Sequence, residues 1–227
     1  GAFVAIAHPQ WSGLTIEDAR SVTAAHAVEV YNHGCAMGCD RPDGFAVLEQ
    51  LLTEGRKLTL VATDDAHFSE PDFFGGWVMV KAQANEPAAL LAALKAGHFY
   101  STQGPELRDV RIEGGRVIVE SSAVVSVVAI GWGTGAKGVH GASMTRTEVP
   151  LERLNNSPWV RVAVIDAAGK RVASGGAQWT LLKIDTRYQW LKSDGRWGFE
   201  PVKTTAKIAG GALDISADAP AHVAAQV

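Results

Sequence analysis

The sequence lacks several features that would each mark a particular class of protein. Its 227 residues include two cysteines, too few for a disulfide framework. The net charge is −3, and no long run of either sign gives the footprint of a nucleic-acid or membrane-surface binder. The longest apolar-rich stretch, 123–130, is far shorter than the roughly 20 residues that a spanning helix needs. We therefore expect neither a nucleic-acid partner nor a membrane partner.

The N-terminal segment also lacks the marks of a secretory signal. The stretch "GAFVAIAHPQW" has no basic region and no small-residue cleavage site. It has instead the pattern of the interior of a β-strand, as if sequence upstream were missing. On this basis we expect a cytoplasmic protein.

What the chain does have is enough apolar residues for a core, 47% of the total, and an alternating pattern in its first part. Apolar, β-favouring runs alternate with segments of helical periodicity and helix-capping residues. The expected strands are 2–8, 27–32, 57–63 and 76–82, and the expected helices are 15–24, 43–55 and 86–97. Such alternation predicts an α/β region, most simply with a parallel sheet.

The pattern changes to all-β after about residue 103. A hairpin is expected around Gly114-Gly115, and further strands follow, joined by turns rich in glycine. This part of the chain predicts a β-sandwich or an open barrel. The predicted fold class is thus α/β followed by all-β, with domains at 1–103, 104–179 and 180–227.

Reactive side chains fall where the first three expected strands end. His8 ends the first strand, His33 the second, and the stretch "LVATDDAHF" brings Asp64, Asp65 and His67 to the end of the third. Because the carboxyl ends of parallel strands lie along one edge of a sheet, ligand-binding groups gather there. The placement predicts a functional site at that edge.

Imidazole and carboxylate together suit zinc, manganese or iron, and such a metal lowers the pKa of bound water to about 7. A single histidine at a strand end is more often a packing or capping residue. The recurrence at one edge favours metal binding for His8 with Asp65 and His67, whereas for His33 both interpretations stay open.

Other candidates carry less information. Cys35 and Cys39 lie beside His33, but their spacing is not that of a zinc finger, which favours free thiols in a loop over a zinc or redox role. The later tryptophans are expected to pack in the core or at sheet edges. The glycine-rich stretch 131–138 is expected to form a turn, not a phosphate-binding loop.

Several of these stretches together resemble a known family. The segments "VAIAHPQWSGL", "AVEVYNHGC", "ATDDAHF", "GGWVMVKA" and "LLAALKAGHFYSTQGPE" are similar, in order and spacing, to the C-terminal part of a polymerase and histidinol phosphatase (PHP) metallohydrolase. The similarity extends over residues 1–179 and is greatest to a bacterial phosphoesterase-like branch that includes carbamate hydrolases. The family's opening H-x-H motif has no counterpart here.

The resemblance implies part of a PHP-type (β/α) barrel with metals at its edge, and hydrolysis by a metal-bound hydroxide. By resemblance His8 is a metal ligand, and Asp65 and His67 are the D-x-H ligand pair. His33 matches a position at the same edge, either as ligand or as a phosphoryl contact. The implied catalytic residues are Asp65, His67 and His33. Because the family's first ligands have no counterpart, we expect about one bound metal per chain, fewer than the two or three of the family, with zinc or manganese favoured and iron as an alternative.

The final segment, 180–227, resembles a different family, the bacterial alpha-2-macroglobulin-like proteins. The resemblance implies a β-sandwich segment joined to the hydrolase-like part near Trp179-Thr180. Nothing in this segment suggests thioester chemistry.

These observations together predict a metal-dependent hydrolase of phosphate esters, either phosphodiesters or phosphotriesters, with promiscuous binding of activated substrates. The alternatives are a non-catalytic truncated or chimeric fragment, a carbamate or amide hydrolase, and a protein-interaction module built on the β half. An incomplete barrel would expose an edge strand, which predicts a homodimer or larger assembly.

Overall fold

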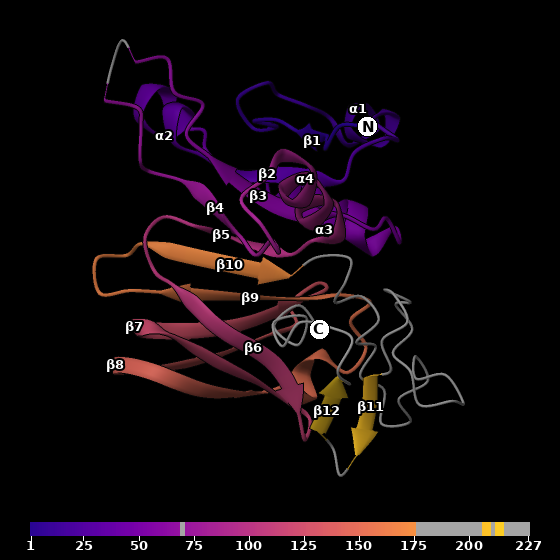
Figure 1. The fold of residues 1–227 in the computed structure, drawn as a ribbon, viewed down its shortest axis with the longest axis vertical. Helices are drawn as coiled ribbons and strands as arrows, with labels where there is room; N and C mark the ends of the chain where they lie inside the picture. Colours follow the sequence, from indigo (N-terminus) through magenta and orange to yellow (C-terminus); the bar gives the residue numbers. More distant parts are fainter. Residues whose placement is uncertain (69–70, 176–205, 210–211, 216–227) are drawn as a thin grey trace.

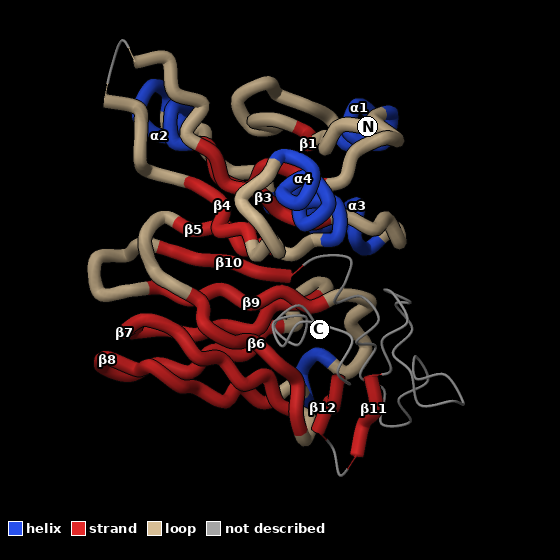
Figure 2. The backbone as a smooth tube through the Cα atoms, viewed as in Figure 1, coloured by secondary structure: helices blue, strands red, loops and turns tan. Residues whose placement is uncertain are grey.

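The computed structural model describes residues 1–68, 71–175, 206–209 and 212–215 (Figure 1). It is a mixed α/β structure with two open sheets, one small and parallel, the other larger and antiparallel. Figure 2 shows the four labelled α-helices in the upper part of the molecule, with β1 to β5 beside them, and mostly strands in the lower part. Among the described residues, no helix is long and apolar enough to cross a membrane.

The small sheet has three parallel strands in the order β1-β2-β3, as the alternating pattern predicted. The strands are β1 (Ala5–Ile6), β2 (Ala27–Asn32) and β3 (Thr59–Thr63). β2 is central and carries a run of buried residues, which is typical of a parallel strand covered on both faces. The carboxyl ends of all three strands therefore lie along one edge of this sheet.

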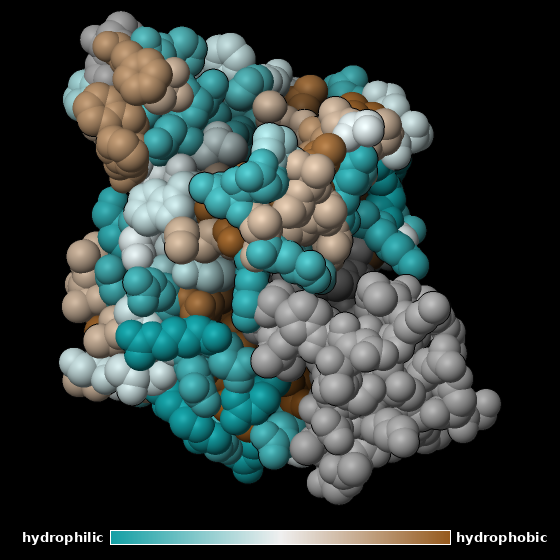
Figure 3. Space-filling view, in the orientation of Figure 1, coloured by the Kyte–Doolittle hydropathy of each residue, from teal (hydrophilic) through white to brown (hydrophobic). Residues whose placement is uncertain are grey.

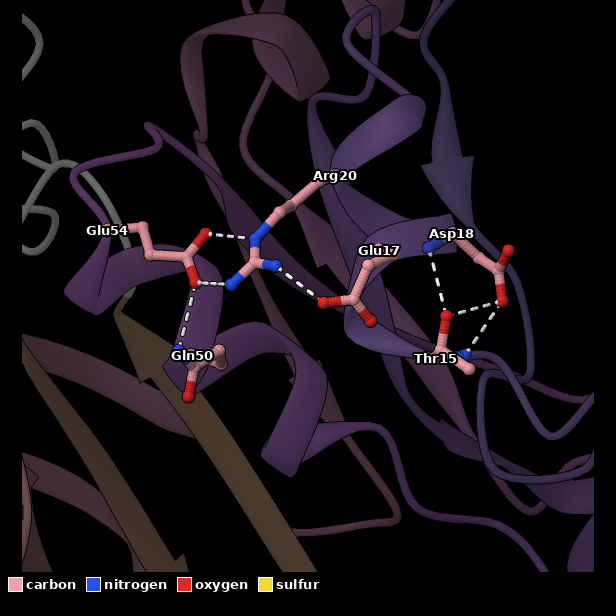
Figure 4. A network of polar contacts seen from close by, with 6 residues as sticks. All are labelled: Thr15, Glu17, Asp18, Arg20, Gln50 and Glu54. Atoms are coloured by element: carbon pink, nitrogen blue, oxygen red, sulfur yellow. Dashed lines mark hydrogen bonds and ion pairs between the residues drawn. The ribbon is translucent and has the colours of Figure 1, made fainter.

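Three of the four α-helices lie where they were expected, and a further short 3-10 helix follows the second long hairpin. Their bounds are α1 (Ile16–Ser21), α2 (His33–Cys39), α3 (Phe45–Thr53), α4 (Pro87–Ala96) and η1 (Glu152–Leu154). At the start of α1 the side chains of Thr15 and Asp18 each accept a hydrogen bond from the other's backbone N–H, forming a capping box (Figure 4). α4 begins at Pro87 and ends at Gly97 with φ 75°.

α2 was not expected, because its sequence "HGCAMGC" was interpreted as a loop. Asn32 starts this helix: its side-chain Oδ1 accepts the backbone N–H of Cys35 at 2.8 Å. Asp40 ends it in the left-handed conformation, with φ 56°. A good N-cap and a residue that tolerates positive φ thus outweigh the two glycines inside the helix.

The second sheet has nine strands in the order β11-β12-β6-β7-β9-β10-β5-β4, with β8 paired to β7 off this path. Its strands are β4 (Trp77–Val80), β5 (Phe99–Thr102), β6 (Leu107–Glu113), β7 (Arg116–Gly131), β8 (Ala136–Pro150), β9 (Val160–Ile165), β10 (Arg171–Gly175), β11 (Ala206–Ala209) and β12 (Ala212–Ile215). The hairpin expected at Gly114-Gly115 joins β6 to β7, and both glycines have positive φ. β7 is one long strand of 16 residues, and its register shifts at irregularities within the β7–β8 pair.

The described residues do not form the expected barrel, and neither of their sheets is closed. The interpretation failed at β4, which was expected to extend the parallel sheet. β4 instead pairs antiparallel with β5, and β5 pairs antiparallel with β10. The chain therefore turns from β3 into the second sheet, and no strand among the described residues joins β3 back toward β1. The β-sandwich expected for the C-terminal region stays a prediction.

The hydrophobic core crosses the expected boundary at 103/104. One cluster combines leucines of α3 with Trp159 and Ala173 of the later hairpin region, so the two parts share buried surface. A second cluster lies wholly within the β-rich part, built from β6, β7 and β9 with their neighbours. The boundary stays a prediction, and most of the segment 180–227, expected to be part of a β-sandwich, lies outside the described residues.

Candidate functional site

The predicted edge exists, because the three parallel strands end beside one another and each is followed by a predicted site residue. His8 lies just after β1, His33 is the first residue of α2 directly after β2, and Asp64 and Asp65 follow β3. The contacts made by each side chain then decide which of these residues share a local environment.

A buried carboxylate that the sequence interpretation missed lies at the centre of this edge. Glu29 of β2 is 4% exposed and accepts three hydrogen bonds. The donors are the backbone N–H of His8 at 2.5 Å, the side-chain amide of Asn32 at 3.1 Å, and the hydroxyl of Thr63. The sequence does show a charged residue, Glu29, inside the apolar strand "AVEVYN". Because an unpaired carboxylate is costly to bury, this position indicates a carboxylate with polar partners.

Asn32 connects Glu29 to the predicted ligand Asp65. Its side chain is fully buried, and its Nδ2 donates at 3.1 Å both to Glu29 Oε2 and to Asp65 Oδ2. His8, Glu29, Asn32 and Asp65 thus form a continuous chain of contacts across all three strand ends. Two of the three predicted metal ligands, His8 and Asp65, belong to this chain, which we call the edge network.

Asp64 has a structural role. Its carboxylate accepts the backbone N–H groups of Phe74 at 2.6 Å and of Gly75 and Gly76 at 2.8 Å. These three contacts fasten the segment that leads into β4 to the end of β3. Of the two neighbouring aspartates, the first therefore holds the backbone and the second joins the edge network.

His67 lies apart from the edge network. Its side chain is 71% exposed, and its Nδ1 is 3.5 Å from Oδ2 of Asp72. The same Asp72 carboxylate accepts the backbone N–H of His67 at 2.8 Å and of Phe68 at 3.3 Å, and these contacts lower the pKa of Asp72. His67 is thus paired with an aspartate of its own loop.

His33 packs against the loop that Asp64 fastens. Its Nδ1 lies 3.0 Å from the hydroxyl of Tyr31. A Cβ added at Gly75 would lie 2.1 Å from the His33 ring, so glycine is required for this close approach. From the sequence, His33 could be either a metal ligand or a packing residue. In the structure its ring packs against Gly75 and makes a polar contact with Tyr31.

Several non-glycine residues at this edge have positive φ, a conformation that most L-residues avoid. They are His8 (29°), Asp65 (52°), Phe68 (59°) and Phe74 (58°). Strained backbone of this kind often gathers at functional sites, where surrounding contacts hold it in place. Its presence at two residues of the edge network is an independent reason to examine this edge.

Exposed aromatic side chains lie on the loop next to the edge. Phe68 and Phe74 are 79% and 83% exposed, and Phe73 contacts both of them. In Figure 3 apolar side chains gather at the upper left of the molecule, over the loop after β3. This apolar surface lies beside Asp72 and the loop that carries His67.

The two cysteines are free thiols, as expected, but they lie on α2 and not in a loop. Cys35 is buried, and burial raises the pKa of its thiol to about 11. The exposed Cys39 directs its Sγ to the carbonyl of Cys35 at 3.3 Å. The Cys35 thiol therefore stays protonated at neutral pH, which disfavours it as a zinc ligand or nucleophile.

The donor types at the edge fit zinc or manganese, but their arrangement is incomplete. Within residues 1–68 and 71–175 and the two short C-terminal strands, no group of three or more His, Cys, Asp or Glu side chains is placed to hold a metal ion. The Nδ1 of His8 is engaged with the hydroxyl of Ser12 at 2.7 Å. The metal site of His8, Asp65 and His67 stays a prediction.

Comparison with protein families finds a match in the C-terminal part. Residues 151–227 match the model of bacterial macroglobulin domain 6. The match begins at 151 and not at 180, so it includes β9 and β10 as well as the segment whose resemblance was noted from the sequence. It spans less than half of the chain, and it supports only the macroglobulin-like part of that resemblance.

The comparisons give no support for the PHP resemblance of residues 1–179. Comparison with curated proteins gives no match, and comparison with solved structures gives none. For the α/β part, the argument for function therefore rests on the residues and contacts of the chain itself.

Proposed function

We propose that the edge network is the site of a metal-dependent hydrolase acting on phosphate esters. The observation that carries the proposal is the chain of contacts from His8 through Glu29 and Asn32 to Asp65, which joins the ends of three parallel strands. Glu29 is a buried carboxylate at this edge, linked through Asn32 to a second carboxylate, Asp65, and to the backbone of His8; carboxylate and imidazole ligands suit a divalent transition metal.

In this proposal Asp65 and the ring of His8 supply metal ligands, and His67 supplies a third from its loop. Glu29 and Asn32 orient Asp65 and the backbone of His8, as outer partners orient the ligands of known metal sites. His33 is assigned to contact with a phosphoryl oxygen of the substrate. A bound zinc or manganese would polarise that oxygen and lower the pKa of a water to about 7.

The second candidate is a non-catalytic binding module. The observation that favours it is the lack, among the described residues, of a formed three-ligand group, together with the exposure of His67. The macroglobulin match of residues 151–227 is also consistent with a module that serves a larger assembly. In that case the edge network would be a buried polar network that stabilises the strand ends.

Metal content and activity distinguish the two candidates. The purified protein is equilibrated with zinc or manganese, and bound metal is measured by elemental analysis. Hydrolysis of bis(p-nitrophenyl) phosphate is then followed with and without chelator. The hydrolase proposal expects about one metal per chain and slow hydrolysis that chelator abolishes and metal restores. Absence of both metal and hydrolysis supports the binding module.

Variants test the assignment of residues. Asp65→Asn keeps a side chain that tolerates positive φ while removing the charge, so it separates ligand chemistry from backbone strain. We expect it to lower activity at least about tenfold, since changes in outer partners alone commonly cost 10–100-fold. The control Cys39→Ala alters an exposed thiol beside the edge and should leave activity nearly unchanged. Full activity in Asp65→Asn with loss in Cys39→Ala would move the site to α2.

A further inference from the structure

A cavity of about 640 Å³ lies where the parallel sheet meets the antiparallel one. One wall comes from β2, β3 and α3, and the other from β5, β9 and β10. Figure 1 shows β5 and β10 beside one another, directly under the N-terminal elements. The volume lies in the range of about 300–1,000 Å³ that small-molecule sites occupy, and such sites favour junctions between structural units.

Small apolar residues on facing strands make the space. Val30 of β2 and Ala62 of β3 line one side, and Ala163 of β9 and Ala173 of β10 line the other. Three of these four side chains end at Cβ, so they leave room between the walls. They give the cavity an apolar patch suited to a compact hydrocarbon or aromatic group, beside the hydroxyls of Ser101 and Thr102, which donate to backbone carbonyls.

Three of the charged groups on the cavity wall are already engaged. Arg161 donates from Nε and Nη2 to Oε1 of Glu49, at 2.9 and 2.6 Å, and its guanidinium lies 4.0 Å from the centre of the Phe45 ring. The carboxylate of Asp43 accepts the backbone N–H of Phe45 at 2.7 Å. Arg161 and Glu49 therefore neutralise each other, and Asp43 holds the backbone at the start of α3.

Arg171 is the remaining charge on the wall. It is exposed, and within the described part of the chain its guanidinium takes part in no hydrogen bond or ion pair. Its backbone is held firmly, because its N–H donates to the side-chain oxygen of Gln103 at 3.2 Å and its carbonyl accepts the N–H of Gln103 at 2.8 Å. Within the described residues, this guanidinium is thus the positive charge that the cavity offers to a ligand.

Uncharged polar side chains also contribute to the lining of the cavity. Gln103 and Tyr31 both line the cavity. Burial raises the pKa of Tyr31, and a hydrogen bond with the side chain of Gln103 acts in the opposite direction. Tyr31 therefore stays a neutral phenol at physiological pH, and its hydroxyl already contacts Nδ1 of His33 and the side chain of Gln103.

We propose that this cavity binds a small organic monoanion, with a compact apolar or aromatic body inside and a carboxylate at Arg171. The proposal does not rest on the metal site, because none of His8, Asp65 and His67 lines the cavity. Since the walls come from both sheets, a bound ligand would also link the two parts of the protein.

The test is a titration of the whole isotope-labelled protein with benzoate and with its neutral analogue benzamide, followed by NMR. We expect saturable shifts at Gln103, Ala163 and Ala173, with benzoate binding about tenfold more tightly because it gains a charge-assisted contact. Arg171→Gln should remove that difference. The control Arg108→Gln changes an exposed arginine on β6 and should leave both affinities unchanged.

Filling the cavity gives a second, independent readout. Ala163→Leu places a larger side chain inside and should abolish binding of both probes. Ala46→Leu does the same from the exposed surface of α3, in case the first variant fails to fold. Equal affinity for benzoate and benzamide, binding that survives both filled variants, or shifts clustered at His8 and Asp65 would each overturn the proposal. The last result would place anion binding at the strand-end edge instead.

Discussion

Replacing Trp159 by alanine should destabilise both parts of the protein together. Trp159 is 1% exposed and packs in the cluster that contains Leu48, Leu51 and Leu52 of α3. Its indole Nε1 also donates to the hydroxyl of Thr53 at 3.0 Å, so it is anchored at its polar end. The residue comes directly before β9 but packs in the core of the α/β part.

The expected magnitude follows from the buried area. A tryptophan side chain buries on the order of 200 Å², which at about 25 cal/mol per Å² corresponds to about 5 kcal/mol. Measured truncations of buried aromatic residues cost about 3–5 kcal/mol, which is much of the stability of an ordinary domain. We therefore expect Trp159→Ala to lower the free energy of unfolding by about 3–5 kcal/mol. Trp159→Phe keeps most of the packing and should lose about 1–2 kcal/mol.

The assay is urea denaturation followed both by far-UV circular dichroism and by NMR signals assigned to each part. The control is Trp132→Ala, which removes a tryptophan that is 55% exposed and should cost less than about 1 kcal/mol. Signals from α3 and from β9 should lose intensity at the same urea concentration in Trp159→Ala. The reasoning is refuted if the two tryptophan variants lose equal stability, or if the α/β part keeps its original midpoint.

Two further predictions concern charge and assembly. Arg20 and Gln50 contact the Glu54 carboxylate and lower its pKa to about 2, so the carboxylate favours the folded state (Figure 4). The stability lost in Glu54→Gln, measured by urea denaturation, should be constant above about pH 5 and shrink as the pH falls toward 2, and a pH-independent loss would contradict this. Separately, among the described strands β1 pairs with β2 alone, so residues 2–7 offer an open edge and we expect a dimer or larger species. Light scattering at micromolar concentration checks this, and a monomer mass would count against it.

The sequence by itself determined the local elements, because their signals are local. β2 and the turn at Gly114-Gly115 follow from runs of neighbouring residues, and α1 follows from the Thr15–Asp18 capping box. The edge at which His8, His33 and Asp65 lie also follows from local order, since each strand is directly followed by its polar residue. The all-β character of the chain after about residue 103 also follows from a local signal, the glycine-rich turns between its expected strands.

The tertiary structure alone decided how these elements combine. β4 pairs with β5, and β5 pairs with β10, which comes from a much later part of the chain. The residues of β4 do not reveal these partners, so the sequence pattern could not exclude a barrel. The distinct roles of Asp64 and Asp65 depend on which groups face each carboxylate across the fold: three backbone N–H groups for one, and Asn32 for the other. Pairing energies and desolvation are set by these nonlocal neighbours, and adjacent residues of the same type can therefore differ in function.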